Sequence, residues 1–381
     1  MFTGRKRISS RAFILHPDPF TDYEDGLNKL KRSGTVVYNL SKPQVISVFF
    51  TEIPDSVNEG DLIEKYRRIF KVPDELVIIP FPDTFSAISS LFFLFMDLND
   101  EVVVPEPFPP YILPIVDFAG VKITPIETFH SNGFRLPLRD VLEPLINPRV
   151  KLLFYSNPAI STGTLYTPEE IERLLFVSQN YNILMVADES FAFASGEEIQ
   201  TLLEVARRYT NSISLNRILL PFTGVPTCFL TCGGELGKLL KKFQETIFPV
   251  SSGLVRLTYT ALDRFSELLP SMSGFLGERK DILYEVVSGF EDFFIIKPDS
   301  PPAGVIKLPI KDSTKFVEYL LKEFRMDNRT VFVLPLVKLF HDSKKGKDLV
   351  MVDYSNLDVE TLKTGLNILY AGVNQYKKEE E

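Results

Sequence analysis

The chain has 381 residues, of which 45% are hydrophobic and 24% charged, enough apolar material for large cores in about two to three domains. Its formal net charge of −8 excludes a protein that binds nucleic acid non-specifically, because such binding needs a basic surface. No apolar stretch reaches the roughly 20 residues that cross a bilayer, so we expect no membrane partner.

The N-terminus, "MFTGRKRISSRAF", is basic but lacks the long apolar segment of a secretory signal. The two cysteines, Cys228 and Cys232, lie on one predicted strand, and we interpret them as small buried thiols rather than a metal-binding pair. The three histidines, His16, His130 and His341, lie far apart in the sequence, so no metal site is predicted. These features predict a cytoplasmic protein.

From about residue 77, short β-rich segments alternate with helical segments. Most of the β-rich segments are apolar on both faces, which is typical of a parallel sheet covered by helices on each side. The clearest helix begins at Thr167, which is followed by Pro168 in the first helical position and by Glu170, which completes a capping box. The predicted strands are residues 76–81, 101–106, 121–126, 150–157, 183–188, 212–216 and 227–232.

After residue 250 the pattern changes to a long helical region, followed by strands and helices in an α+β arrangement. We expect three parts. Residues 1–45 form an N-terminal segment that packs on the small domain or on a dimer partner. Residues 46–260 form a large domain, and residues 261–381 form a small C-terminal domain.

Several segments, in this order and over nearly the whole chain, resemble the fold type I pyridoxal-phosphate-dependent aminotransferases of the aspartate and histidinol-phosphate aminotransferase type. "NPAISTG" (157–163) is similar to N-P-x-N-P-T-G, and "DEVVVPEPFPPY" (100–111) to G-D-E-V-L-V-P-x-P-x-Y. "VADESFAF" (186–193) is similar to V-D-E-A-Y-x-x-F. The resemblance implies an α/β fold with a mostly parallel seven-stranded sheet in the large domain and a smaller C-terminal α+β domain.

The chemistry of this family needs a lysine that forms a Schiff base with the cofactor and an aspartate that holds the pyridine nitrogen. By the resemblance, Asp188 occupies the aspartate position. The lysine position is occupied by Leu220, or by Arg217 in a shorter register, and no lysine occurs between Lys151 and Lys238. Arginine cannot replace this lysine, because its guanidinium stays protonated and is not an amine nucleophile. We therefore predict no catalytic residue.

The other groups that the family uses are also replaced. The phosphate-binding arginine would fall between Val225 and Cys228, where no arginine occurs, and the carboxylate-binding arginine is replaced by Val350 or Met351. Ile160 replaces an asparagine. The positions that the resemblance places around the cofactor are Asp83, Thr84, Pro109 in place of a stacking aromatic ring, Asn157, Asp188, and Phe191 in place of a tyrosine.

These replacements share one direction, from polar to apolar. Because an unpaired buried polar group costs about 1–3 kcal/mol, apolar filling is expected once a charged ligand is gone. We expect an aminotransferase-like protein that has lost pyridoxal-phosphate catalysis and acts as a binding, scaffold or regulatory subunit. The alternative is a divergent pyridoxal-phosphate-dependent aminotransferase that acts on a small amino substrate. Polar residues that could instead form a new ligand site are Asp83, Thr84, Asn157, Asp188, Glu189 and Asn216.

The resemblance also bears on cofactor and partners. Pyridoxal phosphate is implied by the family alone, and covalent binding is not expected. A homodimer is expected, or a heterodimer with an active paralogue, together with a small-molecule ligand and no nucleic acid.

Overall fold

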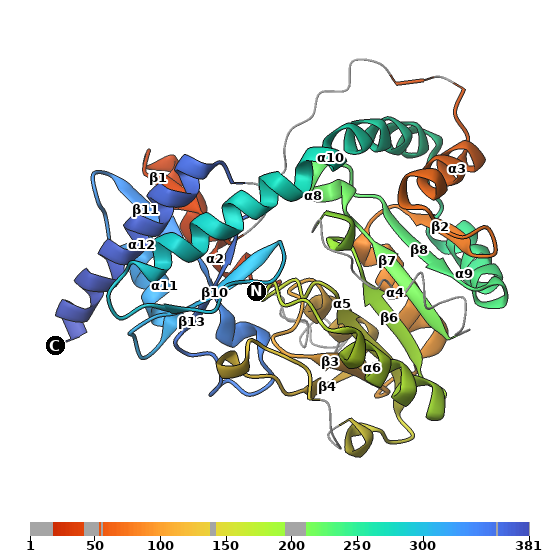
Figure 1. Cartoon of the computed structure of the whole chain (residues 1–381), viewed down its shortest axis with the longest axis horizontal. Coiled ribbons are helices and arrows are strands. Elements are labelled where there is room, and N and C mark those ends of the chain that lie inside the picture. Colours follow the sequence, from red (N-terminus) through yellow and green to blue (C-terminus); the bar gives the residue numbers. More distant parts are fainter. Residues whose placement is uncertain are drawn as a thin grey trace, which may run out of the picture.

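The structure is a computed structural model. It describes residues 18–41, 53–54, 56–137, 142–194, 211–355 and 357–380. The basic N-terminal sequence and His16 lie outside these residues. A large domain and a smaller C-terminal domain lie side by side (Figure 1). No helix in the described ranges is long and apolar enough to span a bilayer.

The large domain is built on a seven-stranded sheet with the order β2-β8-β7-β6-β5-β3-β4. Only β8 runs antiparallel to its neighbours, which confirms the predicted mostly parallel sheet. The strands are β2 (Val77–Phe81), β3 (Glu101–Pro105), β4 (Lys122–Ile126), β5 (Val150–Ser156), β6 (Leu184–Asp188), β7 (Ser212–Asn216) and β8 (Cys228–Cys232).

Both faces of this sheet are covered by helices, and β3 shows how. Val102 and Val104 pack with α4 and α5, whereas Val103, between them, packs with α6. All three are at most 1% exposed, so the strand has to be apolar along its whole length. The helices of the large domain are α3 (Glu59–Phe70), α4 (Thr84–Phe95), α5 (Ile112–Ala119), α6 (Pro168–Asn180), α8 (Leu219–Thr223) and α9 (Gly234–Ile247).

The capping box predicted for α6 is confirmed. Thr167 Oγ1 accepts a hydrogen bond from the backbone N–H of Glu170 at 3.2 Å, and Glu170 Oε2 accepts one from the backbone N–H of Thr167 at 2.7 Å. Glu170 Oε1 also accepts from the backbone N–H of Leu136 at 2.6 Å, so the cap ties the helix to a distant loop.

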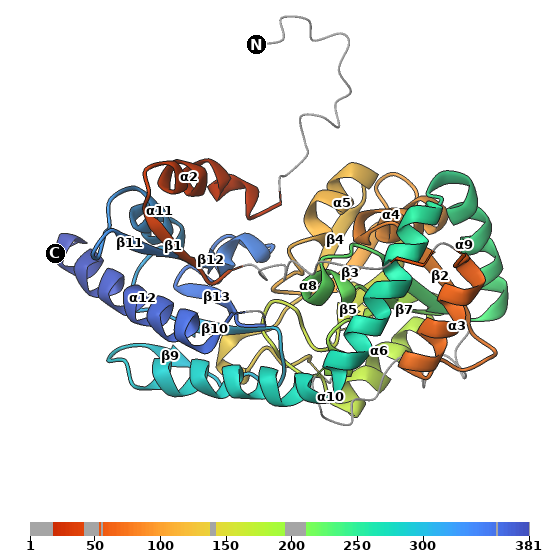
Figure 2. The ribbon, with the colours of Figure 1, turned by 90° about the horizontal axis from the view of Figure 1, so that it is seen from above.

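The helix α10 (Ser252–Ser288) runs from the large domain along the small domain, as Figure 2 shows. The small domain contains a four-stranded antiparallel sheet in the order β12-β13-β10-β9, packed with two helices. Its elements are β9 (Phe294–Ile295), β10 (Ala303–Lys307), α11 (Ser313–Lys322), β11 (Arg329–Phe332), β12 (Leu334–Pro335), β13 (Leu349–Asp353) and α12 (Val359–Glu380).

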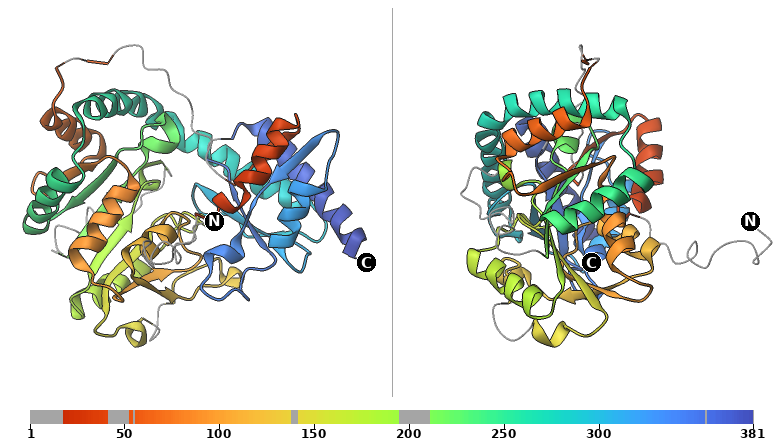
Figure 3. Two further views of the ribbon diagram at one scale, coloured as in Figure 1. Left: turned by 180° about the vertical axis from the view of Figure 1, so that it is seen from behind. Right: turned by 90° about the vertical axis from the view of Figure 1, so that its right-hand side faces the viewer.

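The N-terminal helix α2 (Thr21–Arg32) and strand β1 (Val36–Asn39) lie against the small domain (Figure 3). β1 pairs in parallel with β11, and α2 contacts α11. Residues 18–41 therefore pack on the small domain, and Ser41, two residues after β1, reaches the cavity described below.

Candidate functional site

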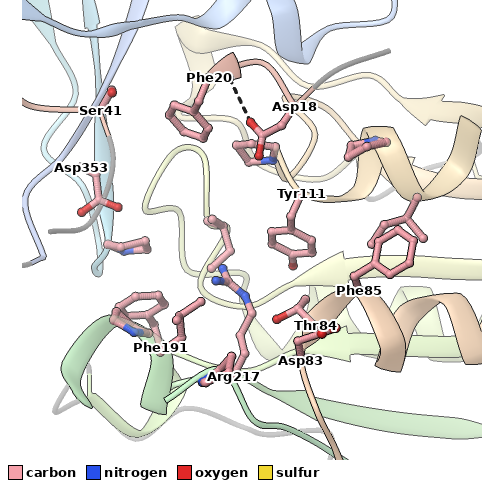
Figure 4. Close-up of a pocket in the computed structure, with 18 of the residues that line it drawn as sticks. Asp18, Phe20, Ser41, Asp83, Thr84, Phe85, Tyr111, Phe191, Arg217 and Asp353 are labelled. Carbon is pink, nitrogen blue, oxygen red and sulfur yellow. Dashed lines mark hydrogen bonds between the residues drawn. The ribbon is translucent and has the colours of Figure 1, made fainter. Parts of the chain in front are cut away.

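A cavity of about 410 Å³ lies at the carboxyl ends of the parallel strands, where the large domain faces the small domain (Figure 4). This end of an open α/β sheet is the usual place for a ligand. The described residues that line it are Asp18, Phe20, Ser41, Asp83, Thr84, Phe85, Pro110, Tyr111, Pro114, Ile115, Ile160, Phe191, Arg217, Leu220, Pro221, Pro226, Pro302, Met351 and Asp353.

Arg217 lines the cavity and forms a buried ion pair with Asp188, which lies outside the lining. Asp188 is the last residue of β6, and Arg217 is the first residue after the neighbouring parallel strand β7, so both lie at the same edge of the sheet. Arg217 Nε donates a hydrogen bond to Asp188 Oδ2 at 3.1 Å, and the Tyr111 hydroxyl donates to the same oxygen. The guanidinium also lies over the Tyr111 ring, 4.5 Å from its centroid, which adds a cation–π contact.

Ser190 completes the set of donors to Asp188. Its backbone N–H donates to Asp188 Oδ1 at 3.0 Å, and its hydroxyl donates to the same oxygen. Asp188 therefore accepts four hydrogen bonds, two on each oxygen, which is about the full acceptor capacity of an ionised carboxylate. Because Asp188 is also 0% exposed, its own chain satisfies it without any ligand.

The electrostatics of this cluster stabilise the charge of Arg217. Burial acts against the charge of Arg217, but attraction by Asp188 and the other neighbours outweighs it, so the pKa of the guanidinium is raised. Burial and the negative charge of Asp188 raise the pKa of the Tyr111 hydroxyl well above its usual value. The phenol therefore stays protonated and keeps its role as a donor to Asp188.

The N-terminus of α4 opens onto the cavity, at the turn that the resemblance assigns to a phosphate. Asp83 is the N-cap of this helix, and its Oδ1 accepts hydrogen bonds from the backbone N–H and the hydroxyl of Ser86, at 2.7 and 2.8 Å. A carboxylate already occupies the place where backbone N–H groups would hold an anion. The neighbouring Thr84 Oγ1 is buried and has no hydrogen-bond partner among the described residues.

The walls of the cavity are mostly apolar. Four positions where the resemblance implies polar groups, Ile160, Phe191, Leu220 and Met351, all line it. Leu220 and Arg217, the two residues considered for the lysine position, both line it as well, and none of the described lining residues is a lysine. The fold therefore brings these five positions together in one cavity.

Asp353, at the end of β13, reaches the cavity from the small domain. Its Oδ1 accepts hydrogen bonds from the backbone N–H and the hydroxyl of Ser355, at 2.9 and 2.7 Å. Burial raises the pKa of this carboxyl to about 6, although the Ser355 hydrogen bonds and the charge of Arg217 act in the opposite direction. Asp353 is 5% exposed and forms no ion pair with any described residue, so the attraction by Arg217 offsets the cost of burying its charge only in part.

Some predicted site residues lie elsewhere. Asn157 Oδ1 accepts a hydrogen bond from the Tyr166 N–H at 2.9 Å and holds the turn instead of facing the cavity. Glu189 and Asn216 are buried outside the cavity lining. Pro109 is also absent from the lining of this cavity.

Sequence reasoning missed several lining residues. One of the aromatic rings in the lining is that of Tyr111, the final residue of the "PFPPY" motif, and this motif was the sequence signal that could have identified it. Asp353 and the N-terminal Asp18 and Ser41 carried no comparable signal, because only the packing of the domains brings them to the cavity. No group of three or more His, Cys, Asp or Glu side chains within the described ranges could hold a metal ion.

A sequence profile of the aminotransferase class I and II family matches residues 59–326, more than half of the chain. The chain belongs to this family. Its similarity to characterised members is distant. The aspartate aminotransferase of Thermotoga maritima is 26% identical over 269 residues, or 68% of each chain. The aspartate aminotransferase of Sulfurisphaera tokodaii is 28% identical over 237 residues, which is 59% of this chain and 56% of that protein.

Solved aminotransferase structures share the fold of this family member. The crystal structure of Thermotoga maritima aspartate aminotransferase superposes with a TM-score of 0.81 at 19% identity, covering 96% of this chain and 100% of that one. The N-succinyldiaminopimelate aminotransferase of Mycobacterium tuberculosis gives a TM-score of 0.79 at 17% identity, with 96% and 100% coverage. Both confirm the predicted fold class, a large domain with a mostly parallel sheet and a smaller C-terminal domain.

Proposed function

We propose that this aminotransferase-fold protein has lost pyridoxal-phosphate catalysis and acts by binding a small molecule in the cavity, as a binding, scaffold or regulatory subunit. The observation that carries the proposal is the cluster around Asp188. The carboxylate that would hold the pyridine nitrogen accepts its four hydrogen bonds from Tyr111, Ser190 and Arg217. A cofactor nitrogen would have to displace the Arg217 guanidinium from a buried ion pair.

The remaining residues do not fit pyridoxal phosphate in the way that the family holds it. No lysine is among the described residues that line the cavity, so the primary amine that the cofactor aldehyde needs is missing there. The phosphate, with roughly two negative charges, would meet the Asp83 carboxylate at the N-terminus of α4. These two features support the loss of covalent cofactor binding independently of Asp188.

The alternative is a divergent pyridoxal-phosphate-dependent enzyme that acts on a small amino substrate. Membership of the family supports it, as does the carboxylate of Asp188 at the end of β6. In this alternative, Arg217 would leave Asp188 when the cofactor binds. The two functions therefore predict different behaviour of the same protein in the presence of pyridoxal phosphate.

The decisive experiment adds pyridoxal phosphate to the purified protein, followed by an absorbance scan, borohydride reduction and mapping of the modified residue by mass spectrometry. An aspartate aminotransferase of known activity serves as the positive control. We expect no reducible yellow adduct in the cavity and no amino-group transfer from amino acid donors. An adduct on a lysine that lines the cavity, together with such transfer, would establish the alternative.

We also propose that the protein is a cytoplasmic homodimer, with a heterodimer containing an active paralogue as the alternative. Three aromatic rings on α4 and α5 support an interface: Phe85, Phe93 and Phe118 are 42%, 43% and 40% exposed, and Phe118 contacts both of the others. Such a patch is typical of a surface that another subunit covers. Light scattering is expected to give twice the chain mass of 43.4 kDa, and a species of 43.4 kDa at micromolar concentration would contradict the homodimer.

A further inference from the structure

We infer that Arg217 is the polar anchor of the cavity: its Nη atoms bind the carbonyl oxygen of an uncharged, largely apolar molecule, while its Nε stays paired with Asp188. The inference rests on the proposed function in one respect, because pyridoxal phosphate would have to displace Arg217 from Asp188. It names the residue that holds the ligand and the chemical class of that ligand, both of which family membership leaves open.

Arg217 is held in one position by contacts on several sides. Its Nε donates to Asp188 Oδ2 at 3.1 Å, and its backbone N–H donates to Ser190 Oγ at 2.9 Å. The guanidinium lies 4.5 Å from the centroid of the Tyr111 ring, and the side chain is 13% exposed. A side chain that is fixed in this way loses little conformational freedom when a ligand binds.

The two Nη atoms of Arg217 are donors without a partner. A guanidinium carries N–H groups on Nε and on both Nη atoms, and among the described residues only Asp188 accepts a hydrogen bond from them. Both Nη atoms remain accessible, in contrast to the buried hydroxyl of Thr84. Figure 4 shows the guanidinium between Phe191 and Tyr111, directed toward the middle of the cavity. A ligand oxygen placed there would accept hydrogen bonds that an apolar wall cannot accept.

The charge of Arg217 is already shared between two carboxylates, which favours an uncharged ligand. The guanidinium forms the ion pair with Asp188. Burial raises the pKa of Asp353, and the attraction by Arg217, together with the Ser355 hydrogen bonds, opposes this rise. A carboxylate ligand on the Nη atoms would compete with both side chains for the same charge. An ammonium ligand could accept no hydrogen bond from Arg217 and would be repelled by it, whereas a carbonyl oxygen accepts these bonds and adds no charge.

The remaining lining sets the body of the ligand. It is mostly apolar, and its residues include Ile115, Ile160, Phe191, Leu220 and Met351. A cavity of about 410 Å³ falls within the usual range for small-molecule sites, roughly 300–1,000 Å³. A phenyl ring on a short chain that ends in an amide or a ketone combines an apolar body of suitable size with the oxygen that Arg217 binds.

The experiment compares four probes that carry a phenyl ring on a similar short chain. 3-Phenylpropanamide and 4-phenyl-2-butanone have an uncharged carbonyl, 3-phenylpropanoate is anionic, and 3-phenylpropylamine is cationic. Each is titrated calorimetrically into the protein without pyridoxal phosphate at pH 7.5. We expect both carbonyl probes to bind at least about tenfold more tightly than the two charged probes. Equal or tighter binding of either charged probe would overturn the inference, and so would a lack of binding by both carbonyl probes up to about 1 mM.

A double variant tests the role of Arg217 directly. Arg217→Met together with Asp188→Asn removes the guanidinium without leaving an unpaired carboxylate at position 188. It should weaken the binding of 3-phenylpropanamide roughly tenfold or more, because hydrogen bonds from a charged donor are lost. The control, Arg264→Met, removes an arginine that is 50% exposed and outside the cavity lining, and it should leave the affinity unchanged. Unchanged affinity in the double variant, with unfolding curves showing that it is folded, would overturn the inference.

Asp353→Asn tests why the ligand is uncharged, in a protein that keeps both Arg217 and Asp188. It removes a carboxylate that competes for the charge of Arg217. The affinity for 3-phenylpropanoate should therefore rise relative to that for 3-phenylpropanamide, by about fivefold or more. An unchanged ratio would overturn the assignment of an uncharged ligand. A borohydride-reducible adduct in the cavity refutes the proposed function, whereas failure of the carbonyl probes to bind without such an adduct refutes the role of Arg217 alone.

Discussion

Replacing Asp353 by Asn should stabilise the ligand-free protein at neutral pH. The folded protein raises the pKa of this carboxyl from 3.8 to about 6, chiefly through burial. The ionised form is therefore less favourable in the folded state than in the unfolded state. Asparagine removes the charge and keeps an oxygen that can accept the two hydrogen bonds from Ser355.

The magnitude follows from the pKa difference. A shift of about two units corresponds to about 3 kcal/mol at about 1.4 kcal/mol per unit. The folded state holds the proton more tightly, so between about pH 4 and pH 6 it binds more protons than the unfolded state. The stability contributed by this group therefore falls as the pH rises through that window, and the full cost is present above pH 6. The gain on replacing Asp353 by Asn should reach up to about 3 kcal/mol at pH 7.5 and vanish near pH 3.8.

The assay is urea unfolding of the wild-type and Asp353→Asn proteins at several pH values between 4 and 7.5. Asp74→Asn, a change at a side chain that is 98% exposed, is the control. Only the Asp353→Asn protein should gain stability as the pH rises, relative to the wild type. A variant that is less stable than the wild type at pH 7.5 would refute the reasoning, because it would mean that Asp353 has a cationic partner in the folded protein.

Three further outcomes are expected. Arg217→Met should destabilise the protein by about 3–5 kcal/mol in urea unfolding, because it leaves the buried charge of Asp188 unpaired, whereas an Arg217→Met, Asp188→Asn double variant should recover part of the loss. Leu220→Lys should lower stability and form no reducible adduct with pyridoxal phosphate, since an ammonium is poorly solvated among apolar walls. Because catalytic groups act as a unit, restoring one of them should not restore activity, and an active variant would contradict this expectation. Gly163→Ala should lower the unfolding midpoint clearly. Gly163 has φ +69°, and a Cβ there would lie 2.2–2.5 Å from the backbone oxygens of residues 300 and 303. An unchanged midpoint would mean that the backbone at this contact between the domains can shift at little cost.

The sequence by itself determined the main architecture. Apolar runs such as residues 101–105 have to be strands covered on both faces, and the Thr167–Glu170 box has to begin a helix. These features depend on neighbouring residues, so they can be read without knowledge of distant contacts. The resemblance to the family motifs also led us to expect Ile160, and either Leu220 or Arg217, at the site, and all three residues line the cavity.

Only the tertiary structure decided which residues meet at the site and how they pair. Arg217 lies 29 positions from Asp188 in the chain, and their ion pair exists because β6 and β7 are parallel neighbours that end at the same edge. Asp353 belongs to another domain, and no local pattern places it at the cavity. Its charge matters because packing removes it from water, and the attraction by Arg217 compensates this burial only in part. Burial and pairing of this kind are properties of the folded whole, since each depends on residues that the sequence keeps far apart.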